Sequence, residues 1–134
     1  MFVDSSAWLA LVSATDGQHA EADRLFGLAL DERVPLVTTD LVLAEVHRLL
    51  LYRAGIRPAA TFLERVEGSA ALTIEFATAA HHRRARAWLA RLGDQLITYT
   101  DAVSFAVIEA VPCRAVLTFD ADFDRAGFVR YTGT

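Results

Sequence analysis

The sequence predicts an α/β fold, a three-layer α/β/α sandwich around a central parallel sheet. Short apolar runs alternate along the chain with longer segments of helical periodicity, and this rhythm is typical of parallel strands joined by helices. The chain has 134 residues, of which 54% are hydrophobic, and a domain of this size can bury a sizeable core. Because no Gly/Ser-rich linker, repeat or low-complexity tract divides the chain, we expect a single domain over residues 1–134.

The predicted strands are short apolar runs that end at turn or capping residues. We expect them at residues 1–4, 35–38, 72–74 and 115–118, with a last edge strand at 128–131. The first run ends on a carboxylate, Asp4. Strands of a parallel sheet are covered on both faces, so this acid comes directly after a segment that must be buried.

Capping and breaking residues predict where the helices begin and end. Ser5 and Ser6 can cap the first helix, and Thr100 can cap the last. Gly55 is a good C-terminal stop, and Pro58 fits the first turn of the following helix, where its missing N–H costs nothing. The predicted helices span residues 5–12, 17–31, 40–54, 58 onward, 78–91 and 100–111.

Charge and composition bound the class of protein. The net charge is −4 and all 13 basic residues are arginine, so the balance argues mildly against a nucleic-acid partner, while any phosphate contact would come from a guanidinium group. The single cysteine, Cys113, cannot form an internal disulfide. The uncharged run at residues 5–15 is shorter than the about 20 residues that cross a bilayer. We therefore expect a cytoplasmic protein.

Four acidic residues stand where chemistry is expected. Asp4 and Asp120 follow predicted strands, and ligands of open parallel sheets bind beyond the carboxyl ends of the strands. Either acid, taken alone, is equally well explained as a helix cap or turn residue. Asp101 opens a helix that is apolar nearly all round, where it would otherwise only complement the helix dipole. Glu45 faces the apolar side of its helix, with only a weak intrahelical partner in Arg48.

Carboxylates gathered at one end of a sheet need a cation, because like charges a few ångströms apart repel one another. Hard oxygen ligands suit Mg²⁺ or Mn²⁺, and no Cys/His spacing supports zinc. Such ions activate water and stabilise the leaving oxygen in phosphodiester hydrolysis. This chemistry needs no side-chain nucleophile, which fits a chain without an evident Ser/His or Cys/His arrangement.

Four segments carry these acids: MFVDSSA (1–7), LAEV (43–46), YTDA (99–102) and LTFDADF (117–123), with AGF (126–128) after the last. In order and spacing they resemble the motifs of PIN domains, in particular the toxins of the VapBC toxin–antitoxin family. No single motif is specific, but the ordered set of four is fairly specific for PIN domains. The resemblance covers the whole chain, and its compact length favours the toxin branch.

The resemblance implies a Mg²⁺-dependent endoribonuclease, with Mn²⁺ as a substitute, that acts as a toxin and hydrolyses RNA through metal-activated water. The catalytic acids that it implies are Asp4, Glu45, Asp101 and Asp120, of which Asp4, Asp101 and Asp120 are the expected metal ligands.

Three further residues are auxiliary in this resemblance. Ser6 and Thr118 match polar positions beside the acids, where they would hold water or a carboxylate by hydrogen bonding. Asp122 would serve as an auxiliary acid. It lies two residues from Asp120, so we expect only one of these two to point inward.

The resemblance also implies partners. Such toxins pair with a small antitoxin whose tail blocks the acidic site, and they often form homodimers. The RNA substrate must be held as well, and the densest basic stretch begins at residue 81. Its Arg83, Arg84 and Arg86 are candidates for RNA contacts, although a solvated helix face explains them more simply.

Alternative functions remain open from the sequence. A PIN-domain nuclease of RNA maturation or decay, without an antitoxin, would carry the same motifs, and so would a PIN fold that binds without catalysis. A receiver-like Mg²⁺-binding signalling module also places acids beyond a first strand, as does a haloacid-dehalogenase-type phosphatase. The absence of lysine disfavours both of these last two classes.

Overall fold

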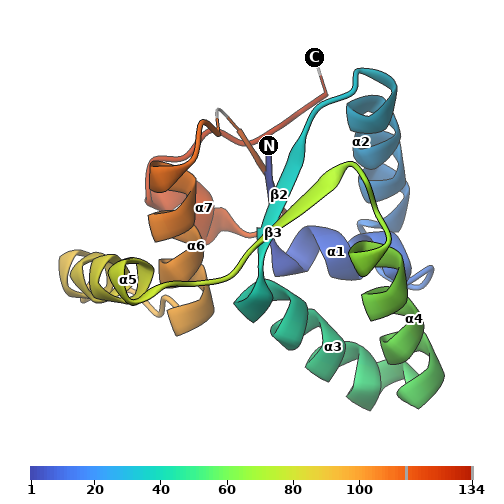
Figure 1. Ribbon diagram of the computed structural model, residues 1–134, viewed down its shortest axis with the longest axis horizontal. Helices are drawn as coiled ribbons and strands as arrows, with labels where there is room; N and C mark the ends of the chain where they lie inside the picture. The colour runs from blue at the N-terminus through green and yellow to red at the C-terminus, as the bar shows by residue number, and fades with distance from the viewer. Residues whose placement is uncertain (114, 134) are drawn as a thin grey trace.

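Four short parallel strands form the central sheet of the computed structural model, which describes residues 1–113 and 115–133 (Figure 1). The strands are β1 (Phe2–Val3), β2 (Leu36–Thr39), β3 (Leu72–Glu75) and β4 (Val116–Leu117). Their order across the sheet is β3-β2-β1-β4, and all three pairings are parallel. The strands from the two ends of the chain, β1 and β4, are therefore neighbours.

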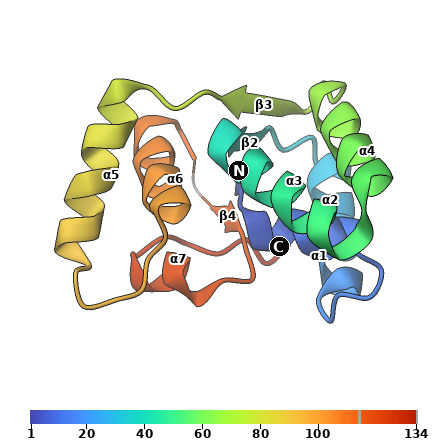
Figure 2. The same cartoon turned by 90° about the horizontal axis from the view of Figure 1, so that it is seen from below.

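Helices cover the sheet on both sides, as the predicted α/β/α sandwich requires. The described residues form α1 (Ser5–Val12), α2 (His19–Asp31), α3 (Asp40–Ala54), α4 (Ile56–Glu67), α5 (Ala79–Arg91), α6 (Tyr99–Ala110) and α7 (Ala121–Arg125). Figures 1 and 2 show α5, α6 and α7 on one side and α1, α2 and α4 on the other. Helix α3 packs against α1, α4 and α6 and so joins the two sides. Within the described residues, no helix is both long and apolar enough to cross a membrane.

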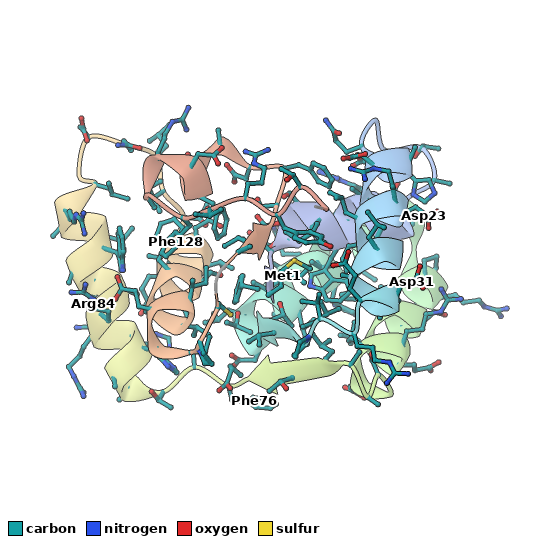
Figure 3. The ribbon with its side chains drawn as sticks, turned by 90° about the horizontal axis from the view of Figure 1, so that it is seen from above. Met1, Asp23, Asp31, Phe76, Arg84 and Phe128 are labelled. Atoms are coloured by element: carbon teal, nitrogen blue, oxygen red, sulfur yellow. The ribbon has the colours of Figure 1, made fainter. Side chains whose placement is uncertain are left out.

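Two aromatic clusters fill the core, one on each side of the sheet. Trp8 of α1 packs against rings of α2 and α4, and Phe105 of α6 packs against rings of α5, α7 and the segment after α7, where Figure 3 labels Phe128. The partners are Phe26 and Phe62 for Trp8, and Trp88, Phe123 and Phe128 for Phe105, with ring centroids 5.1 to 5.9 Å apart. Buried rings in such contacts dominate core energetics, so both flanks of the sheet are firmly held.

Two predicted helix caps are wrong by one or two residues. Helix α1 is capped by Asp4, whose carboxylate accepts from the backbone N–H of Ala7, and not by either serine. Helix α6 begins at Tyr99 and is capped by Thr98, not by Thr100. In both cases the earlier residue has the extended backbone that a cap needs.

The C-terminal region also differs from the prediction. The expected edge strand at 128–131 is reduced to one isolated bridge between Val116 and Arg130, and the short helix α7, which was not predicted, precedes it. The positive φ of Gly127, 91°, turns the chain between them. Helix α7 is important for the site because its N-cap, Asp120, and its first turn, with Asp122, both belong to it.

Candidate active site

The predicted acidic residues come from separate parts of the chain and meet at the carboxyl end of the sheet. Asp4 follows β1 and Asp120 follows β4, and these two strands pair side by side. Asp101 lies in the first turn of α6 and Asp122 in the first turn of α7. Glu45 reaches the site from α3. The topology of the sheet therefore brings five carboxyl groups to one place.

Asp4 is buried, and both oxygens of its carboxylate accept hydrogen bonds. Ser6 Oγ and the Ala7 N–H donate to Oδ1 at 2.8 and 3.1 Å, and Thr118 Oγ1 donates to Oδ2 at 2.8 Å. Burial raises the pKa of Asp4 from its ordinary value of 3.8 to about 6, and the neighbouring charge of Asp120 adds to the rise. The three hydrogen bonds act in the opposite direction, because they favour the charged form.

Asp101 is only 8% exposed, although it lies at the start of a helix. Burial raises the pKa of its carboxyl group from 3.8 to about 7, against the hydrogen bonding of Thr98. The negative charges of Asp120, Asp4 and Glu45 raise it further. At neutral pH this group is therefore partly protonated unless a positive charge compensates it.

Asp101, Asp120 and Asp122 form a cluster of three carboxylates that could hold a metal ion. Each offers an oxygen, and these oxygens all lie within 4.8 Å of one another. Asp120 caps α7 by accepting from the backbone N–H of Asp122 at 2.9 Å. Asp122 also binds Arg125 Nη1 at 2.5 Å. Asp120 and Asp122 thus both belong to the cluster, whereas the sequence suggested that only one of them would point inward.

Hydroxyl groups hold the acids in place. Ser6 Oγ accepts from the Phe119 N–H at 2.9 Å while it donates to Asp4, and Thr118 Oγ1 accepts from the Asp120 N–H at 2.9 Å. These bonds join the turn after β1 to the turn after β4. On the other side of the site, Ser5 Oγ donates to Glu45 Oε2.

The donor set fits a hard divalent cation. Three carboxylate oxygens within 4.8 Å of one another are the ligand type that Mg²⁺ and Mn²⁺ prefer. Burial is the main cause of the raised pKa values of Asp4 and Asp101, and the negative charges of neighbouring acids add to it. Arg125 supplies one positive charge beside several acids, so the protein alone does not balance them.

Comparison with known proteins assigns the family. A family model described as "PIN domain" matches residues 1–129. The chain belongs to the PIN domain family. Two relatives from Mycobacterium tuberculosis, strains CDC 1551 / Oshkosh and ATCC 25618 / H37Rv, are both named "23S rRNA-specific endonuclease VapC20". Each is 37% identical to this PIN domain over 130 residues, which cover 96% of this chain and 95% of the relative.

A solved structure is similar over nearly the same length. The crystal structure of Mycobacterium tuberculosis VapC20, described as a sarcin–ricin loop cleaving toxin, superimposes on this PIN domain with a TM-score of 0.88. It is 34% identical, and the match covers 97% of each chain. The predicted membership of the VapBC toxin group of PIN domains and the predicted fold class are thereby confirmed.

The sequence did not lead us to predict two residues of the site, Ser5 and Thr98. Ser5 was considered only as a cap, yet its hydroxyl binds Glu45. Thr98 positions the first turn of α6 and therefore Asp101. Its signal was present, because a threonine three residues before an acid and ahead of an apolar run is the pattern of a helix N-terminus. No local signal could have found the bond between Ser5 and Glu45, which are 40 residues apart.

The arginines proposed for RNA lie on α5, outside the acidic cluster. Arg84, labelled in Figure 3, is bound to Glu109 of α6 at 2.8 Å, so it joins the two helices. Arg83 and Arg86 are exposed and form no ion pair within the described residues. Of the three candidates, these two are the better placed for a phosphate contact.

Proposed function

We propose that this chain is a Mg²⁺- or Mn²⁺-dependent endoribonuclease that acts in the cytoplasm as the toxin of a type II toxin–antitoxin pair. One observation supports this most strongly: a PIN domain whose relatives are named rRNA endonucleases carries three carboxylate oxygens within 4.8 Å of one another. As in the sequence prediction, we treat residues 1–134 as one domain that holds the complete site.

The acidic residues would have two roles, in binding the cation and in orienting water. Asp101, Asp120 and Asp122 would hold the cation, together with Asp4, whose carboxylate is kept in one orientation by the hydroxyls of Ser6 and Thr118. A bound divalent cation supplies the Lewis acidity that activates water against a phosphodiester.

Glu45 would complete the site from the side of α3. The bond from Ser5 Oγ holds one oxygen of its carboxylate, and the other is left to orient water or to accept a proton. The scissile phosphate needs the cation in order to approach, because the acids otherwise repel it.

We propose RNA as the substrate, and specifically the sarcin–ricin loop of 23S rRNA, because the similar toxin of known structure is described as cleaving it. Arg83 and Arg86 would contact phosphates on the side of α5. Exposed RNA loops present unstacked bases and a bent backbone, which suit a site at the end of a sheet.

The test is cleavage of ribosomal RNA by the purified protein. We expect a discrete cut in 23S rRNA with Mg²⁺ or Mn²⁺ and no cut in EDTA, as judged by gel and primer extension. Zn²⁺ or Ca²⁺ in place of Mg²⁺ is the control for a general effect of divalent ions. Cleavage that persists in EDTA would contradict a metal-dependent nuclease. Cleavage of another RNA but not of 23S rRNA would support the ribonuclease activity and contradict the proposed substrate.

We also propose where the antitoxin binds. An open apolar pocket of about 510 Å³ lies between α1, α2 and α4. Its apolar lining includes Trp8, Leu11, Val12, Phe26, Leu30 and Phe62. Leu30 is 53% exposed there, and an amphipathic helix is the usual occupant of such a groove. A basic residue in the antitoxin tail would then be attracted to the acidic site by charge complementarity. The homodimer stays a prediction.

Leu30→Asp is expected to weaken binding of the antitoxin by about tenfold or more, because burying a charge against this apolar lining is unfavourable. RNA cleavage by the variant alone should be unchanged. The measurement is calorimetry with the cognate antitoxin, alongside inhibition of cleavage. Val129→Asp, at an exposed apolar residue outside the groove, is the matched control. Equal affinities for both variants would place the antitoxin elsewhere.

A further inference from the structure

A second pocket opens directly on the acidic cluster, and one of its walls is a loop that the catalytic chemistry does not use. The pocket has a volume of about 560 Å³ and is lined by Gln95, Leu96, Asp120, Asp122 and Arg125. Pockets that bind small organic groups fall in the range of about 300–1,000 Å³. The two aspartates belong to the cluster described above, so a group bound in this pocket lies next to these carboxylates.

Leu96 presents an apolar surface to this pocket. Its side chain is 99% exposed, whereas that of Ile97, the next residue, is partly buried against the core. The loop is held in this shape by two backbone hydrogen bonds, from Gln95 N to Leu92 O and from Ile97 N to Gln95 O, both at 2.9 Å. Leu96 is therefore held out towards solvent by its anchored neighbours.

Gln95 lines the same pocket, and its side-chain oxygen has no hydrogen-bond partner within the described residues. Its Oε1 is buried and accepts no hydrogen bond from the protein. A buried acceptor without a donor is unfavourable, so such groups are rare unless ordered water or a ligand supplies the bond. The amide can offer either its oxygen or its NH₂ group by turning about its last torsion angle, so it can pair with a donor or an acceptor.

The charges of the pocket disfavour a second phosphate as its occupant. Two of the five lining residues are acidic, and the single arginine is already bound by Asp122 at 2.5 Å. A neutral group with a flat apolar face and a polar edge fits better, since the face can pack on Leu96 and the edge can pair with the amide of Gln95. A nucleobase has both features.

We propose that Leu96 and Gln95 form a subsite that holds one unstacked nucleobase of the RNA beside the scissile phosphate. This inference rests on the proposed ribonuclease function and adds the residues that position its substrate. Thr98, which ends the same loop, caps the helix of Asp101. Leu96 and Asp101 are thus only five positions apart in the chain, and base binding holds the RNA next to the acidic cluster.

The test is a kinetic comparison of Leu96→Ala and Gln95→Ala with the wild-type protein, on a short RNA that contains the wild-type cut. Partial burial of one leucine side chain against a base corresponds to roughly a tenfold effect on binding. We therefore expect KM to rise about tenfold while kcat changes less than about twofold. Because Leu96 is fully exposed, its variant should unfold at the wild-type temperature. Ile56→Ala, at an 80% exposed aliphatic residue at the start of α4, is the matched control and should leave KM unchanged.

A second set of measurements removes a nucleobase from the RNA instead of a side chain from the protein. A series of RNAs carries one abasic nucleotide at each position around the cut. At one position, KM should rise for the wild-type protein, and Leu96→Ala should cause no further rise. Unchanged KM values for both variants, or losses that add fully at every abasic position, would overturn the subsite while leaving the nuclease in place. Failure of the wild-type protein to cut any RNA would remove the proposed function, and the subsite with it.

Discussion

Asp101→Asn is expected to lower the rate of RNA cleavage by about 100- to 1,000-fold at saturating Mg²⁺. The side chain belongs to the cluster, with carboxylate oxygens of Asp120 and Asp122 within 4.8 Å of its own. The substitution removes one negative charge and replaces an oxygen with an NH₂ group, which is no metal ligand. Loss of a single preorganised electrostatic group typically reduces kcat by this factor. The measurement is a single-turnover rate with enzyme in excess, which separates chemistry from product release.

Asp124→Asn provides the matched control for this experiment. Asp124 lies on α7 close to the cluster in sequence, but it is exposed and bound to Arg130. The same chemical change there should leave the rate within about twofold of wild type, because exposed ion pairs contribute little. A full rate for Asp101→Asn would remove this residue from the catalytic site. An equal loss in both variants would indicate a general effect of charge rather than a metal ligand.

The metal-free protein is expected to become less stable as pH rises from 5 to 8. The pKa values of Asp4 and Asp101 are raised by burial from 3.8 to about 6 and about 7. Between about pH 4 and pH 7 the folded state therefore binds more protons than the unfolded chain, and the free energy of unfolding falls with increasing pH. Each unit of pKa shift corresponds to about 1.4 kcal/mol, so the total loss is on the order of a few kcal/mol.

Thermal unfolding in EDTA measures this effect. For a domain of this size, a few kcal/mol lowers the unfolding temperature by about 5–10 °C. Added Mg²⁺ should restore stability at pH 8, where the carboxylates are charged, and should have little effect at pH 5, where protons compete with it. Asp101→Asn in EDTA should be more stable than wild type at pH 8 and should show a weaker pH dependence. A wild-type unfolding temperature that rises with pH in EDTA would contradict the raised pKa values.

Much of the fold could be predicted because its signals are local. Alternation of apolar runs and helical segments predicted the layers, and Gly55, with a φ of 102°, does end α3. The end of α6 was placed within one residue, since Pro112 cannot continue a helix. The C-terminal region could not be predicted in the same way. Whether residues 128–131 form a strand depends on how far they pair with Val116 across the sheet, and α7 depends on burial of Phe123 in the aromatic cluster.

For the site, the sequence predicted which acidic residues take part, because it shows their type and their position relative to the strands. It did not predict which of their side chains contact one another. Asp4 and Asp120 follow strands, and parallel strands end at the same edge, so their proximity could be inferred. The burial that raises the pKa of Asp101 could only be guessed from the apolar helix around it. The joint approach of Asp120 and Asp122 to Asp101 could not be inferred, because it requires the turn of α7.

The amino-acid sequence by itself determined the order of the elements and which acidic residues follow strands or open helices, because propensity, capping and charge are properties of short segments. Only the tertiary structure decided which carboxylates lie within 4.8 Å of one another, which hydroxyls hold the acids, and that the loop of Leu96 lines the same pocket. The physical reason is the order of the sheet. Placing β1 beside β4 joins the two ends of the chain, and side-chain distances across that junction are set by packing between segments that no local pattern relates.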